Sequence, residues 1–139
     1  MTETKTALIN QREYEITLLP AFQSNTIAIK LFNMFFGQLL SSGMSLKDLD
    51  KDNVVRNLSS IYLDPEEINR ILLQLFGSVY ITIDSKKVKL SDIADYHFIG
   101  DLYSMYELAY EVMQANGFLE QFKKAMSKVS TISKIKKST

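Results

Sequence analysis

Residues that could support acid–base or metal chemistry are few and scattered in this sequence. The chain has one histidine, His97, and no cysteine. General acid–base and nucleophilic catalysis need titratable groups that converge in a pocket, and no HExxH or CxxC pattern offers a transition-metal site. His97 stands between Tyr96 and Phe98, where a lone histidine is more often a helix-end or packing residue. We therefore expect no catalytic residue, no metal site, no cofactor and no enzymatic activity.

Three alternating acids resemble the opening of a calcium-binding loop. They are Asp48, Asp50 and Asp52. Counted from Asp48, the sixth position is Asn53 and the twelfth is Ser59, whereas an EF-hand loop needs glycine at the sixth position and a bidentate glutamate at the twelfth. The pattern fails at both diagnostic places, so we interpret this stretch as a solvated acidic connector.

The glycines do not form a phosphate-binding loop. Neither GxxxxGK[ST] nor GxGxxG spacing occurs among the five of them, so the sequence gives nucleotide binding no support. They are Gly37, Gly43, Gly77, Gly100 and Gly117.

Surfaces are therefore the best candidates for function. Two groups of aromatic side chains stand out: Phe32, Phe35 and Phe36 on the first expected helix, and Tyr103, Tyr106 and Tyr110 on the later one. Half-exposed aromatic residues are enriched at protein interfaces, and flexible methionines such as Met34 and Met105 suit an adaptable client. The simpler alternative is that some of them, such as Phe32 and Tyr106, only pack against each other. The residues that we predict to bind a partner are Phe32, Phe35, Phe36, Leu39, Tyr103 and Tyr110.

Two β-hairpins are expected to accompany the helices. Residues 6–19 contain the alternation Tyr14, Ile16, Leu18, which is the period of a half-buried strand. Asn10-Gln11 can provide the turn, because asparagine tolerates positive φ. Residues 79–90 have a similar pattern around Asp84-Ser85-Lys86, which predicts a second hairpin.

Helices account for most of the remaining chain. Residues 27–40 include ten apolar residues out of fourteen, so the helix expected over 21–40 must be buried on several sides by this domain or by a partner. Asp64-Pro65 is typical of a helix start, and Gly77 of a helix end. The helix expected from about His97 to Ala115 has the predicted core stripe Leu102, Met105, Tyr106, Ala109, Val112 and Met113. A short helix around residues 54–62 and a last one from 118 complete the series.

These elements predict a mostly α-helical, α+β fold. An N-terminal β-hairpin would be followed by a bundle of about five helices, with the second short hairpin near residues 79–90. We expect residues 1–129 to form a single domain and residues 130–139 a flexible lysine-rich tail, because that end is rich in Ser, Thr and Lys.

The charges are distributed unevenly along the chain. Residues 1–120 contain all sixteen acids and carry a net charge of −6, whereas residues 121–139 carry +6. An acidic body argues against a broad nucleic-acid surface. No apolar run approaches the ~20 residues of a membrane span, and the polar start does not match a signal peptide. We expect a soluble intracellular protein without membrane or nucleic-acid partners.

The order of elements resembles one group of tail assembly chaperones from long-tailed bacteriophages. The likeness covers most of residues 7–122. It rests on the run from Ile9 to Ala21, with its hairpin and Leu19-Pro20-Ala21 before a long apolar helix, and on Tyr96-His97-Phe98 followed by an aromatic helix and Asn116-Gly117-Phe118-Leu119. Asn10-Gln11 replaces the more usual Asn-Gly turn, and the lysine-rich tail has no counterpart.

The resemblance implies a non-enzymatic assembly factor. Such a protein binds the tape measure protein and the tail tube protein in the host cell cytoplasm and is absent from the mature virion. The sequence is also compatible with a homo-oligomer. Two alternatives stay open: a structural component of a phage tail or tail terminus, and a small nucleic-acid-binding regulator. The second would need a basic recognition helix, but residues 97–115 contain no Lys or Arg.

Overall fold

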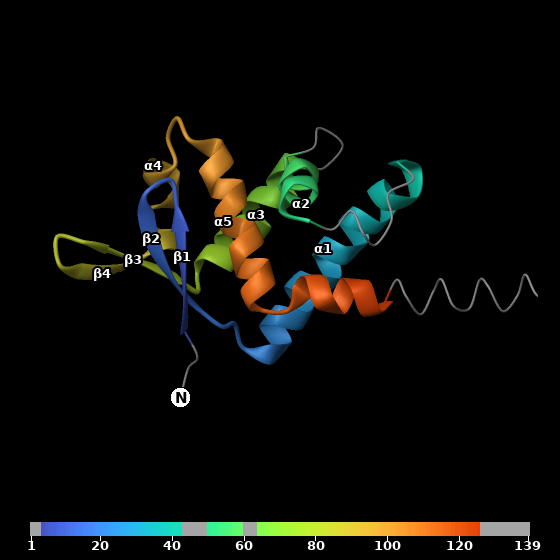
Figure 1. The fold of residues 1–139 in the computed structure, drawn as a ribbon, viewed down its shortest axis with the longest axis horizontal. Coiled ribbons are helices and arrows are strands. Elements are labelled where there is room, and N and C mark those ends of the chain that lie inside the picture. Colours follow the sequence, from blue (N-terminus) through green and yellow to red (C-terminus); the bar gives the residue numbers. More distant parts are fainter. Residues whose placement is uncertain (1–3, 43–49, 60–63, 126–139) are drawn as a thin grey trace, which may run out of the picture.

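The computed structural model describes residues 4–42, 50–59 and 64–125, and within the first range it describes side chains up to Met34. One four-stranded antiparallel sheet packs against a group of helices (Figure 1). This confirms the predicted α+β fold. The last residues of the helix predicted around residues 54–62 and the lysine-rich tail predicted at 130–139 lie outside the described residues.

The N-terminal hairpin is confirmed. Strands β1 (Thr4–Ile9) and β2 (Arg12–Thr17) pair from Thr4 with Thr17 to Ile9 with Arg12. Asn10 and Gln11 form the turn with φ of 50° and 67°. Two consecutive positive φ angles are typical of the tight turn whose twist matches the flanking strands.

The second hairpin joins the first in one sheet. Strands β3 (Val79–Ile83) and β4 (Lys86–Lys89) are connected at Asp84-Ser85, again with positive φ at both residues. Pairing of β2 with β3, through Glu15 with Tyr80 and Ile16 with Val79, gives the order β1-β2-β3-β4. The two hairpins are separated by some sixty residues, so local sequence patterns could not predict this pairing.

Helix α1 (Ala21–Ser42) buries one face in its described part. Ile27, Ala28 and Leu31 are buried, whereas Phe22 is 90% exposed and Ile29 is 50% exposed. Up to Met34, the rest of this chain therefore buries α1 on one face, and not on the several sides that the apolar composition predicts.

Helices α2 (Lys51–Leu58) and α3 (Pro65–Phe76) begin at aspartate caps. The Asp50 side chain accepts a hydrogen bond from the Asn53 backbone N–H at 2.9 Å, and Asp64 accepts one from the Glu66 N–H at 3.1 Å. Such caps stabilise the first turn by ~1 kcal/mol each. Asp50, part of the pattern that resembles a calcium loop, is thus a helix cap, and the predicted start and end of α3 are confirmed.

The predicted helix from His97 to Ala115 is interrupted at its start. A short 3-10 turn, η2 (Leu90–Asp92), leads into α4 (Ala94–His97), and the long helix α5 begins only at Leu102. Between them Gly100 has φ of 77°, a conformation that breaks helical geometry and favours glycine. Leu102 is consequently 60% exposed, so its assignment to the core stripe is wrong.

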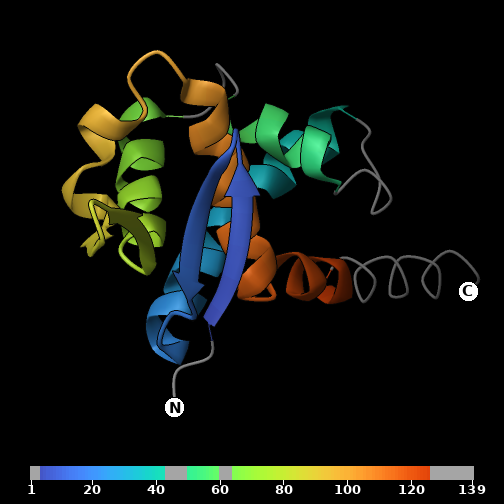
Figure 2. The ribbon, with the colours of Figure 1, turned by 60° about the vertical axis from the view of Figure 1, so that its left-hand side comes forward.

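Helix α5 (Leu102–Ala115) lies at the centre of the molecule, in contact with β1, α2 and α3 (Figure 2). Leu108, Ala109, Val112 and Met113 are fully buried along it. After Gly117, whose φ is 76°, the chain is helical again over residues 118–125. The buried side chains Phe118, Leu119 and Phe122 there join the same core cluster.

Two leucines on α3 provide a test of this arrangement. Leu75 is fully buried and Leu73 is 48% exposed. We expect Leu75→Ala to lower the free energy of unfolding by about 2–5 kcal/mol, because it removes methyl groups from a packed core and leaves a cavity. Leu73→Ala, the matched control with the same chemical change, should lower it by less than about 1 kcal/mol. Urea unfolding followed by circular dichroism measures both, and equal losses would contradict the fold.

Candidate partner-binding surface

An apolar groove lies between α3 and the segment that runs from α4 into α5. Its volume is about 320 Å³. One wall comes from α3 and the other from the α4–α5 corner. The lining residues are Asn69, Leu72, Leu73, Phe76, Ala94, Asp95, Phe98, Ile99, Leu102 and Met105.

The rim of this groove is open to solvent and apolar. Ile99 is 73% exposed, Leu102 is 60% exposed and Leu73 is about half exposed. Phe76 and Phe98 form its buried floor, with ring centroids 5.6 Å apart. Single exposed apolar residues are ordinary on protein surfaces, but several around one concavity are typical of an interaction site.

The groove lies in an acidic part of the chain. Its polar lining residues are Asp95 and Asn69. From Leu90 to Phe122 the sequence contains six acids and no lysine or arginine. Because η2, α4 and α5 all fall in this stretch, this side of the groove carries negative charge, which Arg12 on β2 and Lys51 on α2 offset in part.

A polar cluster fixes the α4–α5 corner to the turn of the N-terminal hairpin. The hydroxyl oxygen of Tyr14 lies 2.7 Å from Nε2 of His97, and Nη1 of Arg12 lies 3.2 Å from the same nitrogen. Asn10 donates a hydrogen bond of 2.9 Å to the Asp101 carboxylate, which also caps α5 by accepting from the Ser104 N–H. Both ends of the corner that carries Ile99 are therefore held by the N-terminal hairpin, through its turn and through β2.

The ionisation of this cluster follows from its surroundings. Burial, followed by the nearby positive charge of Arg12, lowers the pKa of His97 below 6.5. Burial also raises the pKa of Tyr14. Hydrogen bonds from Ser104 and then Asn10 lower the pKa of Asp101. The imidazole is thus neutral at pH 7 and can accept a hydrogen bond from Tyr14, which gives His97 a positioning role in the fold.

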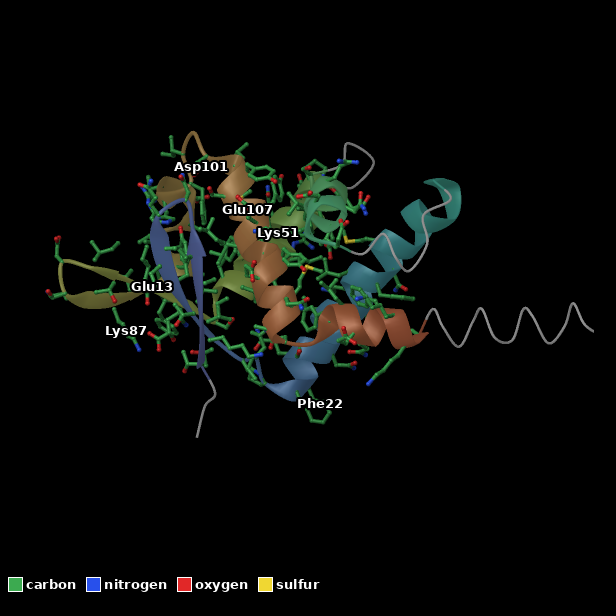
Figure 3. All side chains as sticks on the ribbon, in the orientation of Figure 1. Glu13, Phe22, Lys51, Lys87, Asp101 and Glu107 are labelled. Atoms are coloured by element: carbon green, nitrogen blue, oxygen red, sulfur yellow. The ribbon has the colours of Figure 1, made fainter. Side chains whose placement is uncertain are left out.

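A second electrostatic contact joins α2 to α5. Lys51 lies 3.0 Å from Glu107 and 3.8 Å from Glu111 (Figure 3). The hydrogen bond with Glu107 is the main reason that the pKa of Lys51 is raised. The lysine side chain is 40% exposed, so the contribution to stability is small, ~1 kcal/mol or less. Its effect is to orient α2 beside α5.

The residues predicted to bind a partner lie in different environments. Tyr103 is 57% exposed at the start of α5. Tyr110, further along α5, is partly buried against the core, and this burial raises its pKa. Phe32 is also partly buried and its ring centroid lies 5.3 Å from that of Phe122. The side chains of Phe35, Phe36 and Leu39 lie outside the described residues.

The groove residues Leu73, Ile99 and Leu102 are absent from the set predicted by sequence. Leu73 follows the buried Leu72 in a strongly apolar helix, and Leu102 continues the period of the α5 core. Leu73 lies outside the buried stripe of α3, whereas the exposure of Leu102 depends on where the break between α4 and α5 falls. The sequence signal for that break is Gly100, two residues before Leu102, because glycine interrupts a helical pattern at some cost.

The described ranges lack two further classes of site. There, no three His, Cys, Asp or Glu residues come together in a way that could hold a metal ion. In the same ranges, none of the helices is both long enough and apolar enough to span a membrane.

Comparison with protein families agrees with the resemblance noted above. Residues 10–128 match the family model described as phage tail assembly chaperone protein, TAC. The chain belongs to this family. No curated protein and no solved structure gives a significant match. The matched range contains every element that forms the groove and the polar cluster at His97, so the groove belongs to the chaperone domain itself.

The lowered pKa of His97 predicts a pH dependence of stability. A base whose pKa is lower in the folded chain than its ordinary value of 6.5 favours unfolding once it takes up a proton. Stability should therefore be complete above about pH 6.5 and should fall as the pH drops through that value. We expect the urea midpoint of the wild type to decrease between pH 7.5 and pH 5.5, and that of His97→Gln to change less.

The test compares how far the urea midpoint of each protein shifts between the two pH values. A loss of stability that the substitution causes equally at both pH values therefore does not affect it. Asp101, whose pKa is lowered from 3.8, titrates below this range and should not contribute. Parallel decreases in the two proteins would show that His97 does not carry the effect.

Proposed function

We propose that this tail assembly chaperone binds the tape measure protein of its phage, keeps it soluble and recruits tail tube subunits during tail assembly. The family match over residues 10–128 supports a role in tail assembly. A chaperone role requires contact surfaces and no bond-making chemistry. In this proposal the protein acts in the host cell cytoplasm and leaves before the virion is complete.

The observation that carries the proposal is the exposed apolar groove on an acidic body. A long helical tape measure protein presents apolar faces until the tube encloses it, and such faces aggregate in water. A helix-in-groove contact can cover them. The net charge of −6 over residues 1–120 keeps the complex soluble, because like charges on neighbouring complexes repel.

The six side chains selected from the sequence remain part of the proposed contact surface. Tyr103 is the one whose exposure in the described residues best suits a partner. Phe32 and Tyr110 would contribute only the part of each ring that the core leaves uncovered. Phe35, Phe36 and Leu39 continue α1 beyond its last described side chain.

Co-expression tests the function directly. The tape measure protein should be recovered mainly in the insoluble fraction when made alone and in the soluble fraction when made with this protein. An affinity tag on the chaperone should retain the tape measure protein, and the tail tube protein when all three are made together. A tape measure protein that stays insoluble, or a chaperone that is found in purified virions at structural stoichiometry, would contradict the proposal.

Tyr103 allows a sharper test of the contact surface. Tyr103→Asp should weaken capture of the tape measure protein by about tenfold or more, as expected when an interface aromatic is replaced by a charge. Because the side chain is 57% exposed, the thermal midpoint should change little. Phe22→Asp is the matched control, since Phe22 is 90% exposed and lies at the opposite end of the molecule from the start of α5 (Figure 3). If both variants capture the tape measure protein equally well, Tyr103 is not part of the contact surface.

A further inference from the structure

We propose that the groove between α3 and the α4–α5 corner is the docking site for one amphipathic helix whose apolar stripe is flanked by lysine or arginine. The natural occupant would be a helix of the tape measure protein, and in that respect the inference rests on the proposed function. The groove itself, its residues and its charge preference follow from the contacts and charges of this chain.

The shape of the groove suits side chains that project from a helix. Its volume of about 320 Å³ admits a few apolar side chains, whereas a whole helix would lie across the rim. Leu73 on α3 faces Ile99 and Leu102 on the other wall. A docked helix would insert residues at spacings of three and four into such a groove and cover the exposed rim.

The floor of the groove is rigid, as a docking site requires. Phe76 and Phe98 are almost fully buried and their rings pack together. Phe98 is followed directly by Ile99, and the corner that holds both is tied to the N-terminal hairpin, with His97 contacting Tyr14 and Asp101 contacting Asn10. Binding should therefore order few residues of the chaperone, and a preformed site loses less conformational entropy on binding.

The charges around the groove select the flanks of the occupant. Asp95 lines the groove, and Asp92 precedes it in a stretch that has no lysine or arginine. The charge of Asp101, which follows the groove residue Ile99, is offset in part by Arg12. On α3 the groove is lined by Asn69, and Arg70 is paired with Glu67 at 3.0 Å. A basic flank would meet complementary potential, whereas an acidic flank would be repelled.

Two synthetic helical peptides test this inference on the full chain. Both have leucine at positions i, i+3, i+4 and i+7, and their remaining residues are lysine in one and glutamate in the other. We expect the leucine–lysine peptide to bind the wild type, with affinity that falls as salt is added, and the leucine–glutamate peptide to bind at least tenfold more weakly. Fluorescence anisotropy of labelled peptides measures both.

Variants of the chaperone locate the site. Ile99→Ser combined with Leu102→Ser should weaken binding of the leucine–lysine peptide by about tenfold or more, because it removes the apolar rim without adding charge. Both side chains are exposed, so folding should be kept. Phe22→Ser, at a side chain that is 90% exposed and far from the groove, should bind normally. Asp95→Asn should weaken binding by about two- to fivefold, as expected for an exposed charge pair, and Glu13→Gln, an exposed carboxylate on β2, should have no effect.

Several results would overturn the inference. Wild-type affinity in the double variant would exclude the groove, and equal affinity for the two peptides would exclude charge selection. Loss of self-association in the double variant, measured by sedimentation, without loss of peptide binding would assign the groove to a second copy of the chain. The peptides contain no tape measure sequence, so the site can hold even if co-expression fails. If the double variant keeps the tape measure protein as soluble as the wild type does, the groove is not its docking site, and the proposed function still stands.

Discussion

Burial of one face of α5 is the constraint on which the other elements depend. Leu108, Val112 and Met113 lose all contact with water there, and each such side chain stabilises the fold by roughly 1.5–3 kcal/mol. The partners that cover this face are β1, α2 and α3, which come from three separate parts of the chain. The sheet and the helices are held in one body because they share this helix.

The same helix explains why an apolar surface stays open at its beginning. The fully buried side chains of α5 lie between Leu108 and Met113, whereas Leu102 lies in the first turn, beside the corner formed at Gly100, and is exposed. Asp101 caps that turn and is held in turn by Asn10. The corner is thus well fixed although its side chains are exposed. A rigid exposed apolar edge suits binding better than a flexible one does.

Charge and apolar contact have complementary roles in this chaperone. The acidic stretch from Leu90 to Phe122 contains the exposed groove residues Ile99 and Leu102, and its negative charge repels other copies of the same surface. Lys51 neutralises part of this charge on the α2 side through Glu107 and Glu111. None of the residues that line the groove is a lysine or arginine, so Asp95 has no such partner among them.

The sequence by itself determined the features that depend on neighbouring residues. The turn at Asn10-Gln11 and the start of α3 at Asp64 follow from local conformational preference and capping, so both could be predicted, as could the family resemblance that the match to residues 10–128 supports. Only the tertiary structure decided that β2 pairs with β3, because that choice depends on contacts between residues far apart in the chain. It also decided that Leu102 is exposed. The apolar period of α5 continues through Leu102, but the chain bends between α4 and α5 just before it, and none of the described elements buries this side chain.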